Sequence, residues 1–91
     1  MNANKNEYQS QPSNKNGVDL ARLILINDQV NTFDHVITVL VEICDHDSIQ
    51  AEQCATITHY KGRCEIKTGV SNDLQPLLAL LKKQGLNAIL V

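Results

Sequence analysis

The chain has 91 residues, 43% of them hydrophobic, and a formal net charge of -2. This length allows one domain with one modest core and excludes a substrate domain built beside a cofactor domain. The weakly acidic balance provides no basic stripe for nucleic acid or an anionic membrane surface, and no apolar run is long enough to cross a bilayer. We therefore expect a cytoplasmic, monomeric binding module with neither a nucleic acid nor a membrane as its partner.

The first elements follow from composition and periodicity. Residues 1–18 are rich in Asn, Gln, Ser and Lys and predict a flexible polar tail, followed by a domain over residues 19–91. An apolar run over residues 20–26 stops at Asn27 and predicts the first strand. Thr32 can then cap a helix whose apolar positions recur at three- and four-residue spacing from Phe33 to Cys44.

The second half of the chain predicts two more helices and two more strands. Asp47 opens a sequence similar to a capping box, with Gln50 at its third helical position, and Gly62 can end that helix. The buried positions of this second helix are expected to be Ala51, Cys54, Ala55, Ile57 and Thr58. Residues 63–67 alternate between charged and apolar, which predicts a half-buried strand with Cys64 and Ile66 inward.

The third helix is expected to begin at a cap provided by Ser71, Asn72 or Asp73, with Pro76 in its first turn, and residues 86–91 predict the last strand. The order is therefore β-α-α-β-α-β, which predicts an α+β sandwich of a three-stranded antiparallel sheet covered by three helices.

The cysteines and two of the histidines are interpreted as structural or solvated residues. Cys44, Cys54 and Cys64 form no CxxC pair, which disfavours a disulfide framework. Each lies singly on an apolar stretch, where a thiol behaves as a small core residue rather than as a zinc ligand. We expect no metal and no cofactor, and we interpret His35 and His46 as solvated residues without a role.

Three polar residues stand where apolar elements end. Asn27 and Asp28 follow the first strand, and His59 lies at the end of the second helix. An α-ammonium presents N–H donors and no acceptor, so its site needs converging acceptors such as an amide oxygen, a carboxylate and an unprotonated imidazole nitrogen. These three residues provide such a set. Alternatively, an Asn-Asp pair after a strand is simply a turn, and a histidine at a helix end is favoured by the helix dipole.

Two segments carry a resemblance to a known family. Residues 27–40, NDQVNTFDHVITVL, resemble the ClpS-family segment Asn-Asp-Asp-x-Thr-Pro-Met-x-x-Val-x-x-Val-Leu. Residues 59–63, HYKGR, are similar to the family's His-x-x-Gly-Lys segment, and the spacing between the two segments also agrees. The resemblance covers about residues 20 to 91. ClpS proteins are adaptors that capture proteins by a bulky N-terminal residue and hand them to a Clp unfoldase for degradation.

The resemblance implies a site, a partner and a lack of enzymatic activity. Asn27, Asp28 and His59 would bind the α-amino group of the substrate. The first side chain would enter a pocket built from Ile26, Asn31, Phe33, Val36, Ala55, Thr58 and Ala88. The partner would be the N-domain of a ClpA- or ClpC-like unfoldase, which the tail over residues 1–18 would engage during delivery.

The chain also departs from the family pattern. Gln29 replaces a second acid, Phe33 replaces the usual gate methionine, and Ala55, Thr58 and Ala88 stand where larger apolar residues are common. The third helix region, residues 71–84, is shorter and lacks the Glu-Thr-Lys pattern expected at the unfoldase interface.

Other readings come from different classes of protein. A hydrolase could use Asp28, His59 and a cysteine, but no nucleophile motif is present. The element order also resembles the C-terminal domain of ribosomal protein L7/L12, so the fold does not determine the function. The alternative to an adaptor is a non-enzymatic interaction domain of this fold that has lost N-degron binding or unfoldase docking.

Overall fold

Three strands and three helices make up residues 19–91, the part of the chain that the structure, a computed structural model, describes. They are β1 (Leu20–Ile26), α1 (Phe33–Cys44), α2 (Ser48–Lys61), β2 (Arg63–Val70), α3 (Ser71–Lys83) and β3 (Ala88–Leu90). The predicted β-α-α-β-α-β order is confirmed. The predicted tail over residues 1–18 lies outside the described residues, and no described helix is long and apolar enough to span a bilayer.

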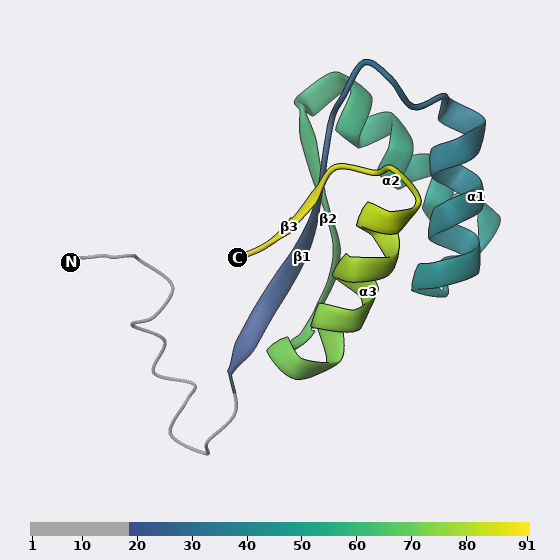
Figure 1. The fold of residues 1–91 in the computed structure, drawn as a ribbon. Helices are drawn as coiled ribbons and strands as arrows, with labels where there is room; N and C mark the ends of the chain where they lie inside the picture. The colour runs from purple at the N-terminus through teal and green to yellow at the C-terminus, as the bar shows by residue number, and fades with distance from the viewer. Residues whose placement is uncertain (1–18) are drawn as a thin grey trace.

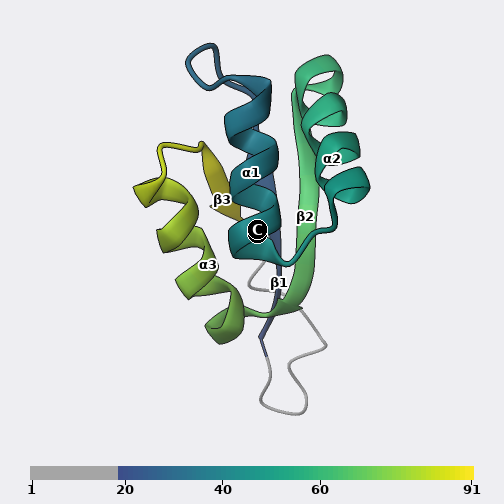
Figure 2. The ribbon, with the colours of Figure 1, turned by 90° about the vertical axis from the view of Figure 1, so that its right-hand side faces the viewer.

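The sheet has β1 at its centre, with strand order β2-β1-β3 and antiparallel pairing on both sides. All three helices lie against one face of this sheet (Figure 1). In Figure 2, α1 lies between α2, which covers β2, and α3, which runs beside β3. The predicted antiparallel sheet covered by three helices is therefore confirmed.

The core lies between the helices and the covered face of the sheet. Its largest fully buried side chains are Leu23, Leu40, Leu74 and Leu81. Burying a leucine side chain of this kind stabilises a fold by about 1.5–3 kcal/mol relative to leaving it exposed. On β1, Ala21, Leu23 and Leu25 belong to this core, whereas Arg22, between Ala21 and Leu23, is half exposed and its side chain lies 3.6 Å from that of Glu65. The residues that alternate with them are Leu20, Arg22 and Ile24, and Ile24 is also buried, at 3% exposure, so the other face of the strand is only partly polar.

Local signals explain where the first two helices begin and end. The Thr32 hydroxyl accepts a hydrogen bond from the His35 N–H at 3.1 Å, and Asp47 accepts one from the Gln50 N–H at 2.7 Å, so both predicted caps are confirmed. Gly62 ends α2 with a φ of 93°, a left-handed conformation that glycine adopts without steric cost.

The start of α3 differs from the prediction. Strand β2 continues to Val70, beyond the predicted end at residue 67, and α3 follows it without a loop. The N-cap position therefore falls on Val70 and no side chain caps the helix, so the predicted cap at Ser71, Asn72 or Asp73 is wrong. Because α3 begins at Ser71, Pro76 lies in its second turn rather than its first.

Two further expectations about burial are wrong. Ile57, predicted to be buried, is 44% exposed, because it lies on the side of α2 that faces away from the sheet. His46, predicted to be solvated, is only 7% exposed. Asp45 takes a left-handed conformation with φ 60°, which turns the chain back after α1, and the His46 side chain reaches the Ile66 carbonyl oxygen at 3.3 Å.

His35, also expected to be solvated, is partly buried, and its Nε2 lies 2.9 Å from the Gln84 carbonyl oxygen. Both histidines therefore make structural contacts that sequence position alone does not indicate.

Candidate functional site

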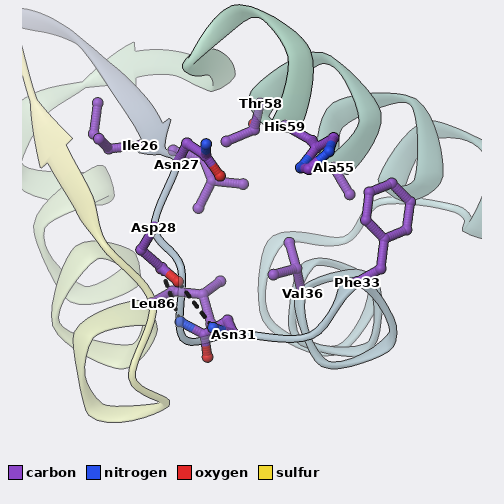
Figure 3. A pocket seen from close by; sticks show the side chains of 11 residues that line it. Ile26, Asn27, Asp28, Asn31, Phe33, Val36, Ala55, Thr58, His59 and Leu86 are labelled. Carbon is purple, nitrogen blue, oxygen red and sulfur yellow. Dashed lines mark hydrogen bonds between the residues drawn. The ribbon is translucent and has the colours of Figure 1, made fainter.

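A pocket opens where β1 ends, between the first turn of α1 and the last turns of α2 (Figure 3). Its empty volume is about 410 Å³, a figure that includes the space at the open mouth. The lining residues are Leu25, Ile26, Asn27, Asp28, Asn31, Phe33, Val36, Ala55, Thr58, His59 and Leu86. Polar residues from the sequence motifs and apolar residues from the core thus meet in one hollow.

The sheet brings Asn27 close to the end of α2. The last pair of the β1–β2 ladder is Ile26 opposite Arg63, and the Asn27 N–H donates to the Gly62 carbonyl oxygen at 2.9 Å. The Asn27 side chain is exposed and has no hydrogen-bond partner within residues 19–91. Its amide oxygen is therefore available to a ligand at the pocket mouth.

Asp28 organises the loop between β1 and α1. Its Oδ1 accepts hydrogen bonds from the backbone N–H groups of Val30 and Asn31, each at 2.8 Å, and its Oδ2 accepts one from the Asn31 side chain at 2.9 Å. Burial pushes the pKa of Asp28 upward, but these hydrogen bonds outweigh burial and hold the pKa below its usual 3.8. The carboxylate is therefore ionised at neutral pH, and its Oδ2 retains room for a further donor.

Asn31 connects this loop to the other side of the pocket. Its side-chain amide donates both to Asp28 and to the Gly85 carbonyl oxygen at 2.9 Å. Gly85 immediately precedes Leu86, which is buried and lines the pocket. Asn31 thus fixes the position of the Asp28 carboxylate relative to Leu86 on the other side of the pocket.

His59 stands on the last turn of α2 beside two other rings. Its ring meets Phe33 edge to face with a centroid separation of 6.4 Å, and it meets Tyr60 in the same way at 4.9 Å. No hydrogen bond to either ring nitrogen is made by the described part of the chain. In Figure 3, Asn27 and Asp28 lie at the end of β1 on one side of the pocket, and His59 lies across from them on α2. We call these three residues the candidate amine site.

The interior of the pocket is apolar and mostly buried. Ala55 and Leu25 are 4% and 2% exposed, and Val36 is partly buried. The Thr58 hydroxyl donates to the Cys54 carbonyl oxygen within α2 at 2.8 Å, so its hydrogen is not offered to the pocket. An apolar side chain could occupy this interior without leaving a donor unsatisfied.

The pocket composition differs from the sequence prediction at three positions. Ala88, predicted as a wall residue, does not line the pocket; it lies in the core opposite Leu25 at 1% exposure. Leu25 and Leu86 line the pocket but were missed. Alternation along β1 could have indicated Leu25, whereas Leu86 depends on the long-range contact between Asn31 and Gly85.

Across residues 19–91, no three His, Cys, Asp or Glu side chains converge in a way that could hold a metal ion. The arrangement offers oxygen and imidazole acceptors beside an apolar hollow, which suits a ligand with a cationic donor next to an apolar group.

Comparisons with known proteins agree with this fold. The family model of ClpS, the ATP-dependent Clp protease adaptor protein, matches residues 17–89. The structure of Agrobacterium tumefaciens ClpS2 bound to L-phenylalaninamide is similar, with a TM-score of 0.68 at 17% sequence identity over 79% of this chain and 94% of that chain. At this identity the likeness shows the fold alone. No curated protein matches. Because the family model covers most of its length, this chain belongs to the ClpS family of Clp protease adaptor proteins.

Proposed function

We propose that this chain binds proteins that begin with a bulky hydrophobic residue and delivers them to the N-domain of a ClpA- or ClpC-type unfoldase of the Clp protease. The observation that carries the proposal is the position of Asn27, Asp28 and His59 at the mouth of an apolar pocket. Membership of an adaptor family supports it.

The candidate amine site suits the free α-amino group of a protein. Ammonium is a compact cation with three N–H donors, and the site offers the Asn27 amide oxygen, the Asp28 carboxylate and an imidazole nitrogen of His59. Hydrogen bonds between charged partners are about twice as strong as neutral ones. An internal leucine or phenylalanine lacks the free amine and would be rejected.

The apolar interior would take the first side chain of the substrate. The similar ClpS2 protein is bound to L-phenylalaninamide, which carries a free α-amino group, an aromatic side chain and an amide in place of the carboxylate. That molecule therefore resembles the first residue of a polypeptide. In this chain, an amine held at the mouth would direct the adjoining side chain toward Val36, Ala55 and Leu25.

The same proposal describes a binding protein rather than an enzyme. The described pocket lining contains neither serine nor cysteine, and its one hydroxyl, on Thr58, already donates within α2. We further propose a monomeric, cytoplasmic adaptor whose domain spans residues 19–91, with residues 1–18 engaging the unfoldase.

The test is fluorescence anisotropy with short labelled peptides that differ only in their first residue, Leu, Phe, Tyr, Trp or Ala, each with a free and an acetylated N-terminus. Binding of the bulky free-amine peptides alone is expected. Asn27→Ala and His59→Ala should each weaken binding roughly 10- to 100-fold, since one charge-assisted hydrogen bond contributes about 1.5–3 kcal/mol. Gln29→Ala, an exposed neighbour that does not line the pocket, is the matched control and should bind normally.

Two outcomes would count against the proposal. Equal binding of acetylated and free peptides would remove the candidate amine site. A folded protein that binds none of the peptides would favour the alternative, an interaction domain of the ClpS fold that has lost N-degron recognition. Delivery is tested separately by titrating the full chain with an isolated ClpA or ClpC N-domain.

A further inference from the structure

Two side chains near the start of α1 hydrogen-bond to the end of α3. The Asn31 side-chain amide lies 2.9 Å from the Gly85 carbonyl oxygen, and the His35 Nε2 lies 2.9 Å from the Gln84 carbonyl oxygen. A carbonyl oxygen only accepts, so the His35 Nε2 carries a hydrogen and donates it. Carbonyl groups at the C-terminal end of a helix have no partner within that helix, so these two side chains supply the missing donors. We call this pair of hydrogen bonds the clasp.

Asn31 joins the clasp to the candidate amine site. Its side-chain nitrogen donates to the Gly85 carbonyl oxygen and also to the Asp28 Oδ2, each at 2.9 Å. Both partners are acceptors, so only the NH₂ end of the amide can face them, and both of its hydrogens are used. The Asn31 Oδ1 faces Gly85, where an added Cβ would lie 3.9 Å from it. Figure 3 shows the Asn31 side chain beside Asp28 and Leu86.

We propose that Asn31 is a positioning residue, which with the support of His35 aims the Asp28 carboxylate at the substrate amine and acts through Asp28 rather than by binding the substrate. This inference rests on the proposed function, and it gives Asn31 a different role from the pocket wall that the family resemblance implies. Its two amide hydrogens are held by Asp28 and Gly85, which leaves the Asp28 carboxylate as the group that the amine meets.

The two oxygens of Asp28 are held by different groups. Its Oδ1 accepts from the backbone N–H groups of Val30 and Asn31, whereas Oδ2, which has room for a further donor, is held by the Asn31 side chain alone. A binding group that is already ordered binds more tightly, because its ordering cost is not met at the moment of binding. Removing the Asn31 amide therefore leaves the loop bonds to Oδ1 in place and frees the oxygen that would meet the amine.

The first test uses the free protein. Burial pushes the pKa of Asp28 upward, and hydrogen bonds from Asn31 and Val30 hold it below its usual 3.8. Asn31→Ala keeps its backbone N–H and loses only the side-chain bond, so an NMR titration of the Asp28 carboxyl carbon should show a pKa raised toward 3.8. Gln29→Ala is the control and should leave the pKa of Asp28 unchanged. An unchanged pKa in Asn31→Ala would overturn the proposal.

The second test is a double-mutant cycle with a free-amine Phe peptide, measured where circular dichroism shows each variant to be folded. Asn31→Ala should weaken binding roughly 3- to 10-fold, the equivalent of one ordinary hydrogen bond, and Asp28→Asn roughly 10- to 100-fold. If Asn31 acts through Asp28, the double variant should bind no more weakly than Asp28→Asn alone, because coupled residues are not additive. A role of Asn31 in stability alone predicts no loss among folded variants.

His35 is tested by a conservative pair. His35→Leu removes the donor to the Gln84 carbonyl oxygen and should weaken binding roughly 2- to 5-fold, whereas His35→Gln keeps an N–H donor at a similar reach and should restore wild-type affinity. A Gln variant that binds no better than the Leu variant would remove His35 from the proposal.

The outcomes separate this inference from the proposed function. If the wild-type chain binds the Phe peptide but Asn31→Ala binds equally well, or if the losses in Asn31→Ala and Asp28→Asn multiply in the double variant, the positioning role is wrong and the proposed function stands. If the wild-type chain binds no free-amine peptide, both are wrong.

Discussion

Asp28 has one structural role and one proposed role, and two substitutions can separate them. It holds the loop before α1 through hydrogen bonds from Val30 and Asn31, and in the proposed function its carboxylate also binds the substrate amine. Asp28→Ala removes both roles. Asp28→Asn keeps an oxygen for the two backbone N–H groups but removes the negative charge.

The expected magnitudes follow from these contacts. A net hydrogen bond contributes about 0.5–1.5 kcal/mol, and the Val30 N–H can turn to water because that residue is 88% exposed. We therefore expect Asp28→Ala to lower the free energy of unfolding by about 1–2 kcal/mol, and Asp28→Asn by less than about 1 kcal/mol. For peptide binding, both variants lose a charge-assisted hydrogen bond, which corresponds to a roughly 10- to 100-fold weaker Kd.

The assays are urea denaturation followed by circular dichroism, and anisotropy with a free-amine Phe peptide under conditions where each variant is folded. The diagnostic result is an Asn variant that is nearly as stable as wild type and yet binds as poorly as the Ala variant. Wild-type affinity in Asp28→Asn would refute the contact with the amine, and wild-type stability in Asp28→Ala would refute the role in the loop.

Three more predictions concern stability. Gly62→Ala should lower the free energy of unfolding by about 1–2 kcal/mol, because φ is 93° there; nothing lies within 4 Å of an added Cβ, so the backbone conformation alone causes this loss. Gly69→Ala, where φ is not positive, should lower the free energy of unfolding by less, and chemical denaturation compares the two variants. Leu40→Ala, at a residue with 0% exposure, should lower the free energy of unfolding by about 2–5 kcal/mol. Leu80→Ala, at a residue with 43% exposure, should lower it by less than about 0.5 kcal/mol, and equal losses in the two variants would show that Leu40 is not a core residue. The pKa of Asp28 is lower in the folded protein than its usual 3.8, so its contribution is present above that pH and is lost as pH falls through the folded value. Acid titration should therefore destabilise wild type more than Asp28→Asn, and parallel curves would contradict this.

The sequence predicts most of the fold because its elements carry strong local signals. The strand over residues 20–26 and the helix caps at Thr32 and Asp47 were predicted from patterns within a few residues and are found where expected. The start of α3 was mispredicted because three residues with good capping side chains follow a strand that simply continues into the helix. The position of the cap there is set by where β2 stops pairing with β1, which is a long-range property.

The site was predicted unevenly for the same reason. Asn27, Asp28 and His59, which the family resemblance placed at one site, all line the pocket, and their role in binding an amine stays a prediction. The shape of the pocket was harder to predict. Leu86 lines the pocket beside Gly85, whose carbonyl oxygen accepts a hydrogen bond from the Asn31 side chain. Asn31 and Gly85 are 54 positions apart, so no local sequence pattern predicts this contact.

Strand register explains why the spacing of the two motifs carried more information than either motif alone. Asn27 meets Gly62 only because β1 and β2 end in the pair Ile26 and Arg63, and this register includes an irregularity after Leu23. A slip of one residue would turn every side chain beyond it to the other face of the sheet. The distance in sequence from Asn27 to His59 is therefore matched to this ladder and to the length of the two helices between them. An insertion or deletion in that interval would separate the acceptors even if every motif residue were kept.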